Sequence, residues 1–143
     1  DANNKMSKSD VSKYSRILLT DSSDDISNKI NKAKSDSMKM PSYSNELEER
    51  NEINNLITIY SSISNQSKDH VVDMFADKEI SYFKSELKEI VIDLIEPISS
   101  EIKKIRDDKK YLKTILDSGA AQASERAKKT ISEVNEIMGF SFE

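Results

Sequence analysis

The chain has 143 residues, of which 36% are hydrophobic and 34% are charged, and its formal net charge is −4 at pH 7. This length suits one domain with a modest core, and no apolar run approaches the roughly 20 residues that cross a bilayer. The absence of cysteine fits a reducing compartment, and a content of two glycines excludes a glycine-rich phosphate cradle. We therefore expect a soluble protein of the cytoplasm, or of an organellar matrix, with no membrane partner.

The first notable segment is the polar run KMSKSD at residues 5–10. It places two ammonium groups three positions apart among hydroxyl groups, with no apolar periodicity to hold it in a helix or strand. Lysine can contact phosphate oxygens as a point charge, and serine can donate a hydrogen bond to the same oxygens. The run predicts either a mobile, phosphate-binding loop or a solvated tail, and its residues alone leave both open.

Beyond residue 22, apolar residues recur at the three- and four-residue spacing of amphipathic helices, and no alternating strand pattern occurs. Ser22 and Asp25 have the spacing of a capping box, which begins a helix. Pro41 indicates an irregular connection at about 38–45. The sequence therefore predicts an all-α bundle of about five helices, preceded by a mobile amino-terminal loop. The expected helices cover residues 23–34, 46–63, 67–76, 80–105 and 108–138.

The two longest predicted helices each contain a feature that affects packing. Pro97 removes one backbone hydrogen bond from the fourth helix, so either a kink at Glu96-Pro97 or a break into two helices is expected. The last helix carries an apolar stripe with alanines at its centre, which would let another helix approach closely. Gly139 follows it and supplies the left-handed residue that commonly ends a helix. The members of the stripe are Leu112, Leu116, Ala120, Ala123, Ala127, Ile131, Val134 and Met138.

Positive charge is concentrated in two parts of the chain, although the total charge is negative. Residues 1–40 contain eight Lys and Arg against six Asp, whereas residues 41–143 contain fourteen against twenty acidic residues. A second basic cluster lies within residues 103–113. Such runs are either solvated helix faces or part of a surface that contacts RNA phosphates, and both interpretations remain open.

Four segments of the chain, in order, resemble the tryptophanyl-tRNA synthetases, a family of class I aminoacyl-tRNA synthetases. KMSKS at 5–9 is similar to the second signature of the class, and residues 16–37 resemble LLDDP followed by KIKKAVTDS. NLITIY at 55–60 is similar to NLLxIY, and YLKTILDSGA at 111–120, with MGF at 138–140, resembles the family's carboxy-terminal segments. Tyrosyl-tRNA synthetases share the signature but not the later segments, so the resemblance indicates the tryptophanyl group.

The resemblance also implies that the chain is a carboxy-terminal piece of such an enzyme. Class I synthetases carry a HIGH-type motif on a Rossmann-like domain before KMSKS, and His70 is the only histidine here. On this interpretation residues 1–21 are the signature loop and the connection from the absent catalytic domain, and residues 22–143 are a helical anticodon-binding domain. A stand-alone helical module that binds RNA or protein, without catalysis, is the alternative.

The family's reaction implies roles for the residues of the signature loop. The parent enzyme would join tryptophan to ATP, release pyrophosphate, and transfer the tryptophanyl group to its tRNA. Lys8 matches the second signature lysine and would contact the pyrophosphate, with Lys5 in support, because ammonium groups stabilise charge that grows on the leaving oxygens. Met6, Ser7 and Ser9 would hold the loop against ATP through hydroxyl and backbone contacts. Magnesium is expected with ATP in the intact enzyme, and none is expected on this chain, since no second His or Cys is present to share a metal.

Residues 34–37 resemble the family's TDS-type segment in the anticodon-binding domain. The resemblance makes Asp36 a candidate acceptor for a cytosine amino group, with Ser37 beside it. Lys34-Ser35 replaces the more usual Val-Thr, and Asp36 or Ser37 could equally cap the first helix or the loop. The implied partners are tryptophan tRNA, and ATP and tryptophan through the absent domain, through which the parent enzyme is also expected to form a homodimer.

Overall fold

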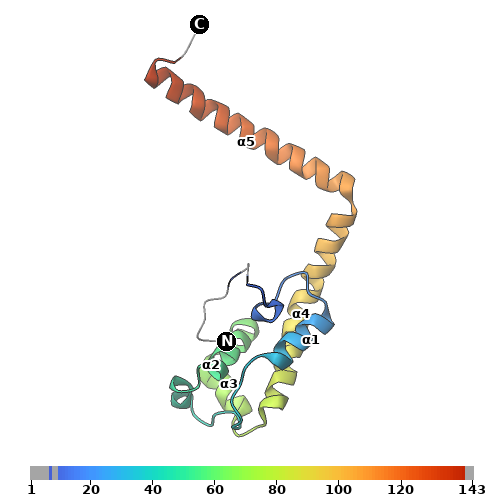
Figure 1. Cartoon of the computed structure of the whole chain (residues 1–143), viewed down its shortest axis with the longest axis vertical. Helices are drawn as coiled ribbons and strands as arrows, with labels where there is room; N and C mark the ends of the chain where they lie inside the picture. The colour runs from blue at the N-terminus through green and yellow to red at the C-terminus, as the bar shows by residue number, and fades with distance from the viewer. Residues whose placement is uncertain (1–6, 8–9, 141–143) are drawn as a thin grey trace. The chain divides into compact units, whose positions relative to one another are not determined.

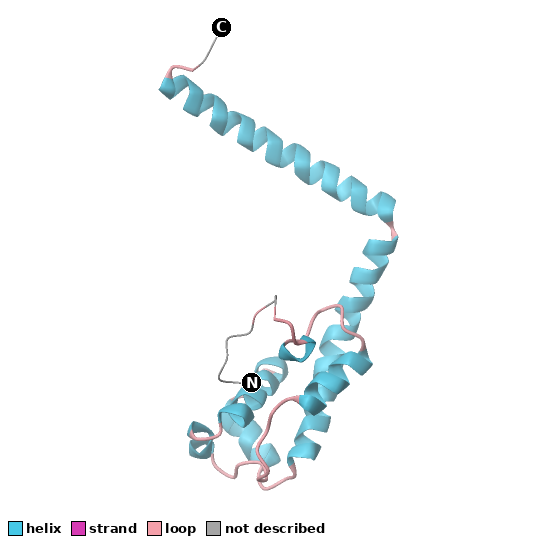
Figure 2. Ribbon diagram, in the orientation of Figure 1, coloured by secondary structure: helices cyan, strands magenta, loops and turns pink. Residues whose placement is uncertain are grey.

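The computed structural model describes residues 7 and 10–140, and the chain divides into two compact units, Asp1–Ser100 and Glu101–Glu143. The described residues contain five α-helices and two short 3-10 helices, and no strand. Figure 1 labels the α-helices along the chain, and Figure 2 colours helices and loops separately. The prediction of an all-α fold with about five helices is confirmed.

In the first unit, two of the α-helices begin at capping residues that the sequence identifies. Ser22 Oγ accepts a hydrogen bond from Asp25 N at 3.1 Å, and the Asp25 carboxylate accepts one from Ser22 N at 3.3 Å, which forms the predicted capping box. Ser67 caps the third helix by accepting from His70 N at 3.2 Å, and His70 is exposed. The elements of this unit are η1 (Lys13–Ser15), α1 (Ser23–Lys32), η2 (Ser44–Glu48), α2 (Asn51–Ser64), α3 (Lys68–Phe75) and the larger part of α4 (Ile80–Asp107).

The second predicted helix begins later than the sequence suggests. A helix from about residue 46 is expected, but η2 ends at Glu48 and α2 starts at Asn51. Arg50 lies between them with φ −120° and ψ 61°, outside the helical region. Its side chain bonds to Asp36 and to the carbonyl of Lys39, so a tertiary contact interrupts what the local pattern would make one helix.

One hydrophobic core joins α1, α2, α3 and α4 in the first unit. Its centre is aromatic: the Phe83 ring lies 5.0 Å from that of Phe75 and 5.9 Å from that of Tyr60, measured between centroids. Met40 is also buried, and its N–H donates to Lys78 O at 2.8 Å, so the connection after α1 is anchored where it enters the core. The other buried apolar residues are Ile26, Ile30, Leu47, Ile53, Leu56, Ile57, Val71, Val72, Ile80, Leu87, Val91 and Ile95.

Pro97 lies inside α4, which continues from Ile80 to Asp107. The expectation of a break into two helices at this residue is therefore wrong, and the alternative of a kink stays a prediction. Proline removes the bond to the carbonyl four residues earlier, at Asp93. Both Asp93 and Pro97 are exposed, so water can satisfy that carbonyl and the helix can continue.

The second unit contains the end of α4 and the whole of α5 (Lys109–Met138). Asp108 caps α5 by accepting from Tyr111 N at 2.9 Å, and Gly139, with φ +72°, ends it as the sequence predicts. None of the residues of α5 is buried. The second helix that its apolar stripe predicts is therefore not supplied by the described part of this unit.

Candidate functional site

The signature loop lies almost entirely outside the described residues. This applies to Lys5, Met6, Lys8 and Ser9, so their predicted contacts with ATP stay predictions. Ser7 is described and exposed, and its carbonyl accepts from Asp10 N at 3.3 Å. This bond ties the signature loop to the segment that follows it.

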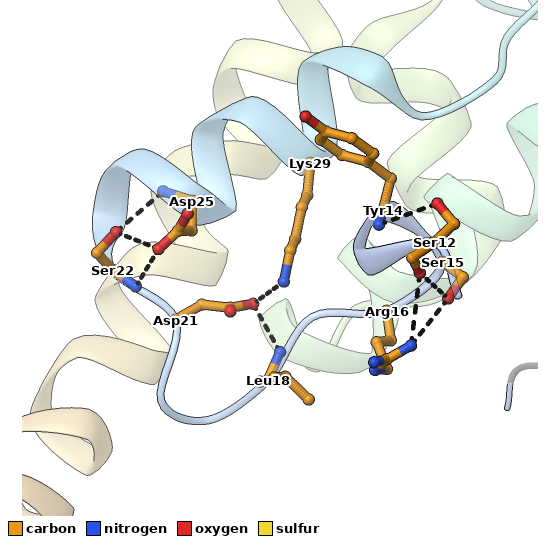
Figure 3. Close-up of polar contacts among 9 residues, drawn as sticks. All are labelled: Ser12, Tyr14, Ser15, Arg16, Leu18, Asp21, Ser22, Asp25 and Lys29. Atoms are coloured by element: carbon orange, nitrogen blue, oxygen red, sulfur yellow. Dashed lines mark hydrogen bonds and ion pairs between the residues drawn. The ribbon is translucent and has the colours of Figure 1, made fainter. Parts of the chain in front are cut away.

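Arg16 organises that segment by donating to several backbone carbonyls. Its Nη1 lies 3.4 Å from Ser7 O, 3.1 Å from Asp10 O and 3.4 Å from Ser12 O. Figure 3 shows the Arg16 head group beside Ser12 and Ser15, whose hydroxyl lies 3.3 Å from the same nitrogen. The Arg16 guanidinium thus donates hydrogen bonds to backbone carbonyls of this short irregular segment, which would otherwise bond only to water.

A buried ion pair fixes the next turn against α1. The Asp21 carboxylate accepts from Lys29 Nζ in α1 and from Leu18 N at 2.7 Å, as Figure 3 shows. Both charged side chains are nearly buried, with 8% and 9% exposed. The segment that follows the signature loop is therefore connected to the helical unit by a charged contact that water does not reach freely.

The segment between α1 and η2 contains Asp36, the predicted anticodon residue, and its carboxylate is bound to Arg50. Arg50 Nε donates to Oδ2 and Arg50 Nη2 donates to Oδ1, each at 2.8 Å. Asp36 Oδ1 also accepts from Met38 N at 3.0 Å. The hydrogen bonds from Arg50 hold the pKa of Asp36 below its ordinary value, so the carboxylate is charged at neutral pH.

Lys84, in α4, holds the start of the same segment. Its Nζ donates to Ala33 O at 2.7 Å and lies 3.5 Å from Asn31 O, at the carboxyl end of α1. The last carbonyls of a helix have no partner within the helix, and a cation there also interacts favourably with the helix dipole. Lys84 is buried, and burial lowers its pKa, because an ammonium group loses solvation there.

The structure therefore gives Asp36 a partner that the sequence did not suggest. Asp36 makes a capping bond within its own loop, to Met38 N, but its bidentate bond is with Arg50. The exposed side chains beside it are Ser37 and Met38, while Arg50 is buried. Asp36 and Ser37 are adjacent in the same exposed loop, so both stay candidates for contact with a base.

Arg50 and Lys84 were missed because charged residues in a helical pattern are usually solvated. The signal that could have identified them is their position within the pattern of buried apolar residues. Lys84 lies on the apolar stripe of α4, at helical spacing from Ile80, Leu87 and Val91, which are all buried. A lone cation in an apolar stripe has to find buried acceptors, because an unpaired buried charge is costly.

A groove of about 780 Å³ lies in the first unit, between α1, α2 and α4. Apolar side chains, including Leu56, Ile59 and Val91, form part of its wall. Basic side chains, including Lys32, also line it. Lys32 Nζ lies 3.0 Å from the Tyr14 hydroxyl and 4.3 Å from the centre of its ring. The hydrogen bond and charge of Lys32 lower the pKa of Tyr14. One face of the Tyr14 ring and its hydroxyl are thus in contact with Lys32 of the same chain.

The second basic cluster, residues 103–113, is exposed except for Ile105 and Leu112, which are half-buried. Part of its charge is balanced nearby: Lys104 pairs with Glu101 at 3.2 Å and Lys113 pairs with Asp117 at 2.6 Å. Exposed pairs of this kind contribute little to stability. The cluster is thus less basic as a surface than its sequence alone indicates.

Within residues 7 and 10–140, none of the helices combines the length and apolar character that a membrane crossing requires. In the same residues, no three His, Cys, Asp or Glu side chains gather in a way that could hold a metal ion.

Comparison with known proteins identifies close relatives. The family described as tRNA synthetases class I (W and Y) matches residues 1–96. The chain is 43% identical over 136 residues to the tryptophan–tRNA ligase of Rickettsia conorii, which covers 95% of this chain and 41% of that protein. It is 40% identical over 140 residues to that of Rhizobium meliloti, covering 98% of this chain and 40% of the relative. The chain thus spans about two fifths of the length of these relatives.

Proposed function

The chain belongs to the class I tRNA synthetases of the W and Y family, and we propose that it is part of a tryptophan–tRNA ligase. The observation that carries this proposal is the identity of about 40% to tryptophan–tRNA ligases across almost the whole of this chain. The parent enzyme would form tryptophanyl-adenylate from tryptophan and ATP and then charge tryptophan tRNA. This chain would supply the KMSKS loop and the recognition of the anticodon.

In the activation step, Lys8 and Lys5 would act on the leaving pyrophosphate. Negative charge grows on its oxygens as the bond to the α-phosphorus breaks, and positioned ammonium groups stabilise that charge. Met6, Ser7 and Ser9 would hold the loop closed on ATP. The bonds of Arg16 to the carbonyls of residues 7, 10 and 12 support this assignment, because they give the loop a fixed base from which to open and close. Magnesium would accompany ATP, and we assign it no ligand in this chain.

In anticodon recognition, we assign Asp36 the role of hydrogen-bond acceptor. An ionised carboxylate has about four lone-pair sites. Oδ1 accepts from Arg50 Nη2 and Met38 N, and Oδ2 accepts from Arg50 Nε. The Asp36 side chain is 32% exposed, so a cytosine amino group could approach the carboxylate from solvent. Ser37, exposed beside it, would add a hydroxyl contact to the same nucleotide.

The 143-residue chain can test this half of the proposal by itself. We expect it to bind a tryptophan-tRNA anticodon stem-loop more tightly than one in which uridine replaces the first anticodon cytosine, as measured by fluorescence anisotropy. Binding should weaken as salt rises, because lysine contacts to phosphates release counterions. Equal affinity for both stem-loops would favour the alternative, a helical binding module that does not read this base.

Membership of this family also bears on the cellular location and the oligomeric state of the parent enzyme. We propose that it works in the cytoplasm, or in an organellar matrix, and forms a homodimer through the part of the enzyme that this chain does not include. Tryptophan and ATP would bind mainly to that part as well. Two measurements on the intact parent enzyme test its assembly and its substrates. Its mass in solution tests the homodimer, and its activity tests the use of tryptophan and ATP.

A further inference from the structure

The segment from Ala33 to Met40, called here the 33–40 loop, is irregular in structure and is held by two cations, one just before α2 and one within α4. Arg50, next to the start of α2, bonds to Asp36 and to the carbonyl of Lys39. Lys84, in α4, bonds to the carbonyl of Ala33. The loop is thus fixed at its beginning, at its middle and near its end. A loop of this length without regular hydrogen bonds would otherwise have considerable conformational freedom.

Arg50 makes contacts that only a planar, forked cation can make. Its Nε and Nη2 each bond to one oxygen of Asp36 at 2.8 Å, and Nη2 also donates to Lys39 O at 2.8 Å. Such bidentate pairs fix orientation as well as distance. Lysine offers a point charge and could keep the attraction but not this geometry. Because the Arg50 side chain is only 7% exposed, it cannot itself reach an RNA base.

Core packing does not explain why Lys84 is buried. Its ammonium group lies on the buried stripe of α4, where an aliphatic side chain would avoid the cost of desolvation. What it gains there is the bond of 2.7 Å to Ala33 O, at the point where α1 ends and the loop begins. Methionine would fill a similar space without that bond, so the contact with the loop can be removed separately from the packing.

We propose that Arg50 and Lys84 are positioning residues for anticodon recognition, which hold the 33–40 loop so that Asp36 and Ser37 meet the base in one fixed geometry. This inference rests on the proposed function, because it assumes that the loop reads the anticodon. Neither cation touches the RNA. Each acts through a carboxylate or carbonyl of the loop, so its removal affects the discrimination between bases more than the general attraction to phosphates.

The test compares wild type with Arg50→Lys and Lys84→Met in the 143-residue chain. Two further variants are matched controls: Arg126→Lys makes the same arginine-to-lysine change at an exposed residue of α5, and Lys88→Met makes the same lysine-to-methionine change one turn further along α4. Each protein is titrated with two stem-loops, one with the cytosine at the first anticodon position and one with uridine there. Thermal unfolding of each variant shows that the fold is retained.

We expect wild type and both controls to prefer the cytosine stem-loop by about 5- to 150-fold. In Arg50→Lys and Lys84→Met this preference should fall to within about 2-fold, while affinity for the uridine stem-loop stays unchanged. A variant that had simply lost its fold would lose affinity for both stem-loops. Hydrogen exchange provides a second readout, since the Met38 amide should exchange faster in both variants if its bond to Asp36 is loosened.

The outcomes separate this inference from the proposed function. If wild type discriminates and both variants discriminate equally well, with unchanged exchange at Met38, Arg50 and Lys84 do not position the loop and the inference is wrong. If wild type does not discriminate at all, the anticodon-reading role of the loop is wrong, and the inference falls with it. If one of the two variants does not fold, the other decides the result in the same way.

Discussion

Lys29 in α1 forms an ion pair with Asp21, and both side chains are less than one-tenth exposed. A buried charge that loses its partner is costly, so Asp21→Ala should lower the free energy of unfolding by about 3 kcal/mol. Urea denaturation at neutral pH, followed by circular dichroism, measures this change. The control is Lys39→Met, which breaks an exposed pair with Glu79 at 3.8 Å and should cost less than about 1 kcal/mol. Equal losses in the two variants would show that the Asp21 contact is no stronger than an exposed pair.

The bond between Asp36 and Arg50 should make the free energy of unfolding depend on pH in the acidic range. Arg50 lowers the pKa of Asp36 in the folded state, so the stabilisation is fully present above the unfolded pKa of about 4 and is lost as pH falls through the lower, folded pKa. The unfolding free energies of wild type and Asp36→Asn should therefore differ at pH 6 and converge towards about pH 2. Urea titrations at several pH values measure the difference. A difference that stayed constant over this range would mean that Asp36 contributes through shape and not through charge.

The aromatic centre of the first unit predicts a large effect of truncation. Phe83 is fully buried and packs against the rings of Phe75 and Tyr60. Phe83→Ala should lower the free energy of unfolding by about 3 to 5 kcal/mol, because it removes buried surface and leaves a cavity. Tyr43→Ala, at an exposed aromatic residue, is the control and should change it by less than about 1 kcal/mol. If the two variants were equally stable, the core would not be centred on these rings.

The proposed role of Lys8 predicts a specific kinetic effect in the intact parent enzyme. Lys8→Ala should lower the rate of adenylate formation by about 100-fold or more, because charge on the leaving pyrophosphate loses its stabilisation. The affinity for tryptophan should change little. Single-turnover measurements of adenylate formation, with tryptophan varied, separate the two effects. A preserved rate with weaker tryptophan binding would contradict the role assigned to Lys8.

The 143-residue chain alone should not activate tryptophan. Two lysines on a loop cannot supply the proximity that the reaction needs, because the residues that would bind adenosine and indole are proposed to lie outside this chain. The measurement is tryptophan-dependent exchange of labelled pyrophosphate into ATP, with the intact parent enzyme as the positive control. Exchange by the isolated chain above background would refute this prediction.

Local features of the fold could be predicted from sequence because their causes are local. The capping box of Ser22 and Asp25 spans three positions, and the end of α5 at Gly139 needs only one residue with positive φ. The start of α2 could not be predicted, since it depends on the bond of Arg50 to Asp36, fourteen positions earlier. The contact of Lys84 with Ala33 spans 51 positions. Contacts at such separations depend on how the helices are arranged, which periodicity does not specify.

In the candidate site, too, the local motif could be predicted from sequence, whereas the contacts between distant residues could not. The resemblance identified the 34–37 segment and Asp36, but it gave no reason to expect that both carboxylate oxygens are already bonded. Nor did it indicate that Lys84 reaches the loop from α4. A short motif describes the residues that meet a ligand, whereas the residues that hold the motif in place are scattered along the chain.

The packing of Tyr60 against Phe75 and Phe83 also has a spectroscopic consequence. The chain contains no tryptophan, so its near-ultraviolet absorption and intrinsic emission are dominated by five tyrosines. Tyr60 is buried, whereas the other four, Tyr14, Tyr43, Tyr82 and Tyr111, are all exposed. Burial also raises the pKa of Tyr60, so its phenol should ionise at a higher pH than a tyrosine with the ordinary pKa. A single natural chromophore thus reports on the interior of the first unit, and added tryptophan can be detected without interference from the protein's own indole groups.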